Sequence, residues 1–167
     1  RVIPWDEVSA TEGTGIVLQN RGGGFVLDCP TTWAVLEDVQ GAALVLVPTD
    51  NLHPGQSFSA TLSVLVAPGG ADDDDARTAR YLEAFDEVGQ VLDDAVLLDA
   101  EDTTVAGYAA KRILATYRAG SRGLTLDQWV VPRRADQLVL TGTSRNAEYP
   151  GLAETFESIA ASVREAS

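Results

Sequence analysis

The side chains best suited to catalysis or metal binding are few, beginning with one histidine and one cysteine. His53 lies in the loop-like stretch DNLHPG, and Cys29 ends an alternating run. One histidine cannot build a histidine-rich metal site, and no G-x-S-x-G motif supplies a nucleophile for a triad around His53. A lone cysteine excludes an internal disulfide and the CxxC spacings of zinc and redox sites. We therefore interpret His53 as a turn residue and Cys29 as a buried structural thiol.

The glycine cluster and the carboxylate clusters are also better explained by structural roles than by ligand binding or catalysis. No Lys-Ser/Thr pair follows Gly22–Gly24, so a tight reversal is favoured over a phosphate loop. Asp72–Asp75 lack the ligand spacing of a calcium loop, and helix capping is favoured because carboxylates bind free N–H groups at a helix start. The pairs Asp93/Asp94 and Glu101/Asp102 are interpreted as a solvated acidic surface rather than acid/base catalysts. We expect no enzyme activity, no metal and no cofactor.

Charge is the most informative feature of the composition. The 167 residues carry a formal charge of −13 and a pI near 4.3, which disfavours nucleic acids and anionic membranes as partners. Asp72–Asp102 hold 12 acidic residues against two arginines, a net charge of −10. Residues 107–145 hold seven basic residues against two acidic ones, a net charge of +5. The sequence thus predicts a molecule with one acidic and one basic side.

Four arginines in the basic segment are the candidate partner-binding residues. Arg118 and Arg122 flank one predicted hairpin connector, whereas Arg133 and Arg134 occupy the next, at the opposite end of the meander. Guanidinium groups suit carboxylates, because their N–H groups match both oxygens. These arginines therefore either pair with the chain's own acidic segment or dock an acidic partner.

The elements that must position these residues follow from hydropathy. Residues 1–14 have no clear period and are predicted to form an irregular arm. Alternating strands are predicted from residue 16, and the clearest is residues 58–66, where apolar side chains alternate with Ser and Thr. Three further runs, within residues 106–144, form an antiparallel meander. No apolar run approaches the roughly 18 residues of a membrane span.

Two helices complete the pattern. Leu82, Phe85, Val88 and Leu92 form one apolar stripe, and a second repeats from Leu152 to Val163, with Pro150 acceptable in the first turn. The order of elements lacks βαβ alternation. We expect an α+β domain over residues 15–167, with an antiparallel sheet of about six or seven strands flanked by two main helices.

Short motifs along Gly15–Arg164 resemble the PsbP/Mog-like fold, in particular its bacterial branch of LpqN-type actinobacterial lipoproteins and related domains of unknown function. The likeness rests on a strand ending in Pro and followed by Trp, a VAGYAAKR-type strand entry and a final F-x-x-I-x-x-S helix. The residues that carry it are Phe25, Pro30, Trp33, Gly107, Ala109, Phe156, Ile159 and Ser162. Pro30 would end strand pairing and Trp33 would re-enter the core.

The resemblance implies a non-catalytic accessory module, since members of the family bind other proteins or serve larger complexes. It favours a cell-envelope or secreted location, although no lipobox cysteine stands near the start. We expect a charged surface that docks a protein partner. The alternative is an envelope carrier of a small apolar ligand or lipid, with a cavity between sheet and helix lined by Phe58, Leu62, Phe85 and Phe156.

Overall fold

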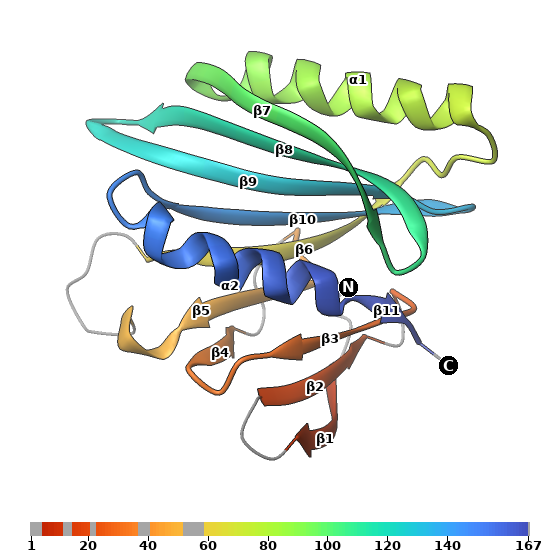
Figure 1. Cartoon of the computed structure of the whole chain (residues 1–167), viewed down its shortest axis with the longest axis vertical. Coiled ribbons are helices and arrows are strands. Elements are labelled where there is room, and N and C mark those ends of the chain that lie inside the picture. The colour runs from red at the N-terminus through yellow and green to blue at the C-terminus, as the bar shows by residue number, and fades with distance from the viewer. Residues whose placement is uncertain (1–4, 12–14, 21–22, 37–40, 52–58, 167) are drawn as a thin grey trace.

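The computed structural model describes the chain except for residues 1–4, 12–14, 21–22, 37–40, 52–58 and 167. Across the described residues the chain forms a seven-stranded and a four-stranded antiparallel sheet with two α-helices (Figure 1). This architecture confirms the predicted α+β class with an antiparallel sheet and two main helices. The smaller sheet was not predicted as a separate layer.

The smaller sheet has the strand order β1-β2-β3-β11, with β1 at Trp5–Thr11, β2 at Gly15–Asn20, β3 at Phe25–Cys29 and β11 at Arg164–Glu165. The larger sheet has the order β4-β5-β6-β10-β9-β8-β7. Its strands are β4 (Trp33–Leu36), β5 (Leu44–Pro48), β6 (Thr61–Pro68), β7 (Asp93–Val105), β8 (Tyr108–Ala119), β9 (Arg122–Pro132) and β10 (Asp136–Arg145). A 3₁₀-helix occupies Thr49–Asn51.

The prediction of an irregular arm over residues 1–14 is wrong for Trp5–Thr11. This segment is strand β1, which pairs with β2 through a register shift between Glu7 and Ser9. Its sequence, WDEVSAT, mixes polar and apolar residues without a strict alternation, and a bulge breaks the two-residue period on which strand prediction depends. Pairing with a neighbouring strand, rather than local pattern, therefore defines this element.

Pro30 marks the point where the chain leaves the smaller sheet for the larger one. It lies between β3 and β4, and its carbonyl accepts a hydrogen bond from the Trp33 N–H at 3.0 Å. Trp33, 6% exposed, then packs its ring edge-on against Phe156, with 6.0 Å between ring centroids. The predicted roles of Pro30 as a strand end and Trp33 as a core anchor are confirmed.

Helix α1 (Asp74–Val91) begins where the aspartate run predicts. Asp73 is its N-cap, and its carboxylate accepts a hydrogen bond from the Ala76 N–H at 2.7 Å. Tyr81 and Val88 are buried against the larger sheet, but Leu82 is 57% exposed. The predicted stripe is therefore wrong at Leu82, because the side chain one position earlier takes the inward place.

Helix α2 (Tyr149–Ser162) covers the opposite face of the larger sheet and also contacts the smaller one, whereas α1 lies on the far side of β7–β9 (Figure 1). The alternation of β9 fixes these faces: Val130 packs with Tyr81 of α1, while Trp129 and Val131 share the α2 core. The main core thus lies beneath α2.

Candidate functional site

The surface that stands out is built around β7, the edge strand of the larger sheet. Val96, Leu97 and Leu98 are 55%, 52% and 57% exposed, and Val91 at the end of α1 is 70% exposed. The register skips Leu98, which leaves it without a partner on β8. We define the β7 surface as these apolar residues with the neighbouring carboxylates Asp93, Asp94, Asp99, Glu101 and Asp102, all of them exposed.

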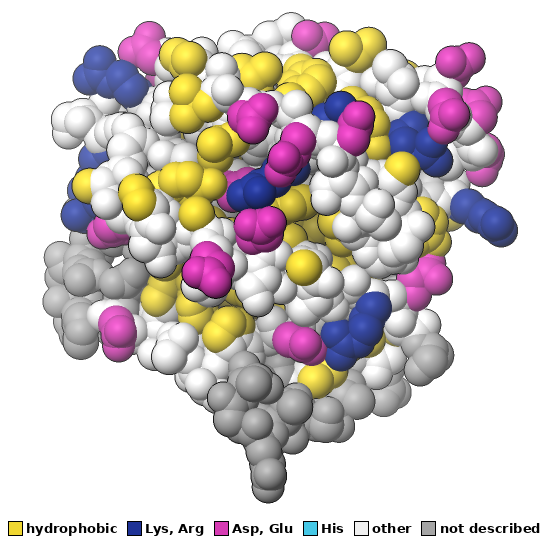
Figure 2. Space-filling model, viewed as in Figure 1, with side chains coloured by type: hydrophobic (Ala, Val, Ile, Leu, Met, Phe, Trp, Pro, Cys, Tyr) yellow, Lys and Arg dark blue, Asp and Glu magenta, His cyan; other side chains and the backbone are white. Residues whose placement is uncertain are grey.

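Figure 2 shows apolar and acidic side chains interleaved over the part of the molecule that β7 and β8 occupy in Figure 1. Large apolar side chains that gather at one exposed strand edge can mark a site of interaction with another molecule. The two register shifts in β7 lie on either side of Val96 and Leu97. Such bulges bend an edge strand and redirect its side chains, which is how successive apolar residues reach solvent here.

Strand β8 supplies basic partners to three of these carboxylates. Lys111 pairs with Asp102, and the Arg112 Nη1 lies 3.3 Å from a Glu101 oxygen. A longer pair, 3.7 Å, joins Arg118 to Asp94. Antiparallel pairing of the acidic strand with the basic one places these groups side by side, so the predicted acidic and basic sides partly neutralise each other within one sheet. Exposed pairs of this kind contribute at most about 1 kcal/mol each.

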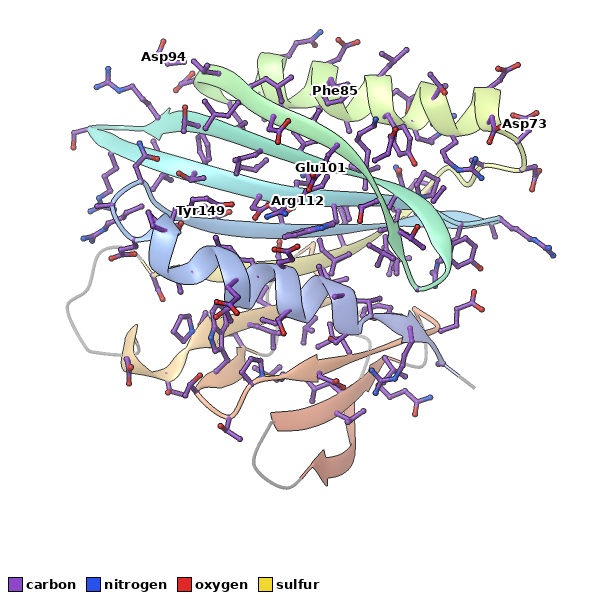
Figure 3. All side chains as sticks on the ribbon, in the orientation of Figure 1. Asp73, Phe85, Asp94, Glu101, Arg112 and Tyr149 are labelled. Atoms are coloured by element: carbon purple, nitrogen blue, oxygen red, sulfur yellow. The ribbon has the colours of Figure 1, made fainter. Side chains whose placement is uncertain are left out.

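Behind the β7 surface lies a closed polar cluster on the α2 face of the sheet. Asp127 of β9 is fully buried, and Arg112 donates to both of its oxygens, at 2.9 and 2.8 Å. The Tyr149 hydroxyl of α2 donates to the same carboxylate at 2.9 Å. The guanidinium also lies over the Trp129 ring, 5.0 Å from its centroid. Figure 3 places Arg112 between Glu101 and the start of α2, where Tyr149 lies.

The electrostatics of this cluster favour structure over catalysis. Burial, followed by the negative charge of Asp127, raises the pKa of Tyr149 to about 12. The hydrogen bonds to Asp127 also raise the pKa of Arg112, so both donors keep their protons at neutral pH. A neutral phenol and a charged guanidinium that both bind one carboxylate hold α2 against the sheet. We therefore interpret the cluster as a clamp for the helix.

The four predicted partner-binding arginines separate into two pairs at opposite ends of β9, as the hairpin pattern indicated. Arg118 is exposed at the end of β8 and Arg122 begins β9. At the other end, Arg133 is 9% exposed and donates to both oxygens of Asp136 and to the Gly23 carbonyl. Arg134 is exposed. Arg133 thus joins the two sheets, whereas Arg118 borders the β7 surface through Asp94.

The other candidates from the sequence have structural roles where they can be seen. Cys29 is 2% exposed, and burial raises the pKa of its thiol to about 11, which suppresses the reactive thiolate. No cluster of metal-binding side chains occurs among the residues described, and no helix there is long and apolar enough to cross a membrane. His53 and Phe58 lie outside the described residues, so their predicted roles stay predictions.

The interior beneath α2 is filled where the carrier alternative would place a cavity. Leu62 and Phe156 have no exposed area. A Cβ atom on Gly142 of β10 would lie 2.8 Å from the Phe156 ring, closer than such contacts occur. The aromatic ring therefore occupies the groove that only a glycine leaves open. Phe85 belongs to a separate cluster with Tyr81 on the α1 face.

Sequence reasoning missed the β7 strand. Its carboxylate pairs were interpreted only as solvated surface, although Val96–Leu98 and Thr103–Val105 are β-prone. Gly107, in the turn after this strand, was also a usable signal in the sequence, because glycine readily adopts positive φ angles. Ala106 and Gly107 both have positive φ angles, 54° and 80°, as a two-residue hairpin turn between β7 and β8 requires.

No family model and no curated protein matches the sequence of this chain. Solved structures do match. LpqN of Mycobacterium tuberculosis, described as involved in cell envelope biogenesis, has a TM-score of 0.67 at 18% identity, covering 98% of this chain and 92% of that one. Cyanobacterial PsbP (CyanoP) from Synechocystis has a TM-score of 0.61 at 17% identity over 95% and 98% of the two chains. The Ran-binding protein Mog1p of Saccharomyces cerevisiae has a TM-score of 0.56 at 10% identity over 97% and 94%.

Proposed function

We propose that this chain, which has the PsbP/Mog-like fold that its sequence predicts, is a non-catalytic accessory module that binds a protein partner through the β7 surface. The observation that carries the proposal is the exposure of Val96, Leu97 and Leu98 within a rim of carboxylates. Burying such a patch against a partner removes apolar area from water, and the polar rim keeps the free protein soluble.

The rim also defines the chemistry of the partner. Five carboxylates surround the apolar residues, and β8 neutralises them only in part. A basic partner is attracted by this field and held in register by it, and its association slows as salt screens the charges. The charged docking surface expected from the sequence is thus proposed here, with its main charge negative.

The four arginines enter this proposal in two ways. Arg118 borders the β7 surface through its ion pair with Asp94, and Arg122 follows the turn after β8; both would offer contacts to acidic groups at the periphery of the same partner. Arg134, exposed at the far end of β9, would serve only a partner large enough to span the sheet. Arg133 contributes indirectly, because its bonds to Asp136 and Gly23 fix the loop that carries Arg134.

The structural neighbours support the class of function. Mog1p is a Ran-binding protein, so this fold is used to bind another protein. LpqN is involved in cell envelope biogenesis, which supports an envelope or secreted location for this chain too. No cofactor is part of the proposal, and a protein partner is favoured over a lipid-like ligand because Leu62 and Phe156 fill the space beneath α2.

Site-specific photocrosslinking in the native host tests the proposal. A photoreactive benzoylphenylalanine replaces Leu97 in one variant and Leu65 in the control. Leu65 is 40% exposed on β6, and three strands separate β6 from β7 in the sheet. We expect a discrete crosslinked partner from position 97, which weakens as salt rises, and none from position 65.

Equal crosslinking at both positions, or none at position 97, would contradict docking at the β7 surface. Changing Asp93, Asp94 and Asp99 together to Asn tests the charge separately. The triple variant should fold normally, because these side chains are exposed, yet it should lose most of the crosslink at position 97. An unchanged yield would remove the electrostatic part of the proposal.

A further inference from the structure

The backbone of β7 offers a second kind of contact besides its side chains. Among the described residues, β8 is the only strand paired with β7, so the other side of β7 is an open sheet edge. Seven consecutive residues, Asp99–Val105, keep a regular register with β8. An extended open edge of this kind is a template for another strand, because its outer N–H and C=O groups lack ladder partners.

One edge donor can be identified directly. The Ala100 N–H donates to the Asp99 carboxylate at 2.8 Å, so it is not engaged with β8. In an antiparallel ladder alternate residues point their N–H groups to opposite sides. The N–H groups of Asp102 and Thr104 therefore face outward with that of Ala100. These three donors define the segment of β7 that is available for pairing.

The side chains beside this segment exclude a second copy of the chain as its natural occupant. Glu101 and Asp99 lie on the α2 face of the sheet, opposite Arg112 and Leu114, and Asp102 lies on the α1 face opposite Lys111. Two such edges placed together would set carboxylates against carboxylates, and like charges across a strand pair are destabilising. The charges on this edge therefore disfavour pairing with a second copy of β7 and favour pairing with a basic strand.

We propose that the partner inserts an extended basic segment as an added strand along Ala100–Thr104, with Lys or Arg opposite Asp99 and Glu101 and apolar residues on the α1 face. This inference rests on the proposed function, since it specifies how a partner occupies the β7 surface. Main-chain hydrogen bonds hold such a strand, and its alternating side chains give specificity. Leu97 and Ala100, which lie on the α1 face, contact the apolar positions.

A synthetic peptide provides the probe. Its eight residues alternate Lys and Val and its ends are blocked, so all lysines lie on one face of an extended strand. The comparison peptides alternate Glu and Val, or carry N-methyl groups on every second residue so that one edge cannot donate. Binding is measured by fluorescence anisotropy, and amide hydrogen exchange is followed across β7. We expect the Lys-Val peptide alone to bind measurably and to protect the amides of residues 100, 102 and 104.

Two substitutions at one position test the backbone in the protein itself. Ala100→Pro removes the outward N–H, whereas Ala100→Ser retains it and adds similar bulk. Proline is tolerated at an edge where its missing N–H faces solvent, so β8 pairing should persist in both variants. We expect affinity for the Lys-Val peptide to fall about tenfold in Ala100→Pro and to stay within about twofold in Ala100→Ser, since an added strand loses a ladder bond.

The outcomes separate this inference from the proposed function. If the peptide binds in a salt-dependent way but tolerates both N-methylation and Ala100→Pro, strand addition is wrong and charge-based docking stands. The same conclusion follows if the peptide does not bind although position 97 still crosslinks a partner. A third outcome is that position 97 yields no crosslink and the peptide binds the triple Asp-to-Asn variant as tightly as the unchanged protein. In that case the proposal that a partner docks at the β7 surface is wrong. The N-methylated peptide makes the test independent of whether Ala100→Pro folds.

Discussion

The α2 face and the β7 edge belong to one sheet but use similar side chains in opposite ways. Beneath α2, the Asp127 carboxylate has no exposed area and accepts three hydrogen bonds. On β7, the Glu101 side chain is 53% exposed, and its carboxylate contacts the same guanidinium at a longer distance, 3.3 Å. Apolar groups follow the same division, with Phe156 fully buried and Leu97 half exposed.

The difference separates carboxylates that stabilise the fold from carboxylates that are available to bind a partner. A buried carboxylate with every oxygen bonded fixes one packing arrangement, because any other arrangement leaves a charge without partners. An exposed carboxylate beside apolar groups costs the free protein little and is available to a partner. Arg112 lies at the boundary between the two, since it contacts both Asp127 and Glu101.

The largest expected effect is that of Phe156→Ala in the core. Its ring packs against Trp33 and over Gly142, so truncation leaves a cavity and should lower the free energy of unfolding by about 3–5 kcal/mol. Urea denaturation measures the change. Leu97→Ala is the control and should cost no more than about 0.5 kcal/mol. Similar costs for both would mean that the β7 surface is part of the folded core.

Asp127→Ala tests the polar boundary. It leaves the Arg112 guanidinium and the Tyr149 hydroxyl without their main acceptor, and we expect the free energy of unfolding to fall by about 3 kcal/mol. Glu101→Ala removes the exposed carboxylate from the same guanidinium and should be nearly neutral. If Glu101→Ala costs as much as Asp127→Ala, the proposed division between clamp and docking surface fails.

The smallest effect should come from Tyr149→Phe, which deletes one hydrogen bond to Asp127 at about 1 kcal/mol at neutral pH. Its signature is the pH dependence. Because the folded pKa of Tyr149 is raised to about 12 from 10, its contribution is complete below pH 10 and is lost as pH rises through about 12. The free energy of unfolding, measured from pH 9 to 12, should therefore fall less steeply with pH in Tyr149→Phe than in the unchanged protein. Tyr81→Phe is the comparison, because burial also raises the pKa of Tyr81 but this residue packs on the α1 face, away from Asp127. Equal slopes in the two variants would exclude a specific role for the bond between Tyr149 and Asp127.

Much of the fold follows from local pattern, because its signals are short-range. The aspartates that cap α1, the proline in the first turn of α2 and the buried alternation of β3 all act within a few residues. The second sheet does not follow from local pattern. Its last strand pairs Arg164 with Val26, and nothing in either segment identifies the other as its partner.

The candidate site was harder to predict because edge strands lack the usual strand signal. A strand with one packed face alternates, but β7 is exposed along nearly all of its length and carries two register shifts. Its carboxylates were therefore interpreted only as a solvated acidic surface, without a strand beneath them. From sequence alone, the basic segment could either pair with the acidic one or dock an acidic partner. Strand order is what places Asp102 beside Lys111 and Glu101 beside Arg112.

The return of the chain's last residues to β3 has a consequence for biosynthesis. Ser162 accepts a hydrogen bond from the Asp28 N–H across 134 residues of sequence, Arg164 pairs with Asp28, and Ala166 bonds to Gly24. On the ribosome, β3 emerges well before its partner, so this edge of β3 stays unpaired until Arg164 and Glu165 have been synthesised. Contacts so distant along the chain form late and slow folding. The nascent protein thus exposes an unpaired strand edge during synthesis, and such an edge is a surface that a chaperone can bind.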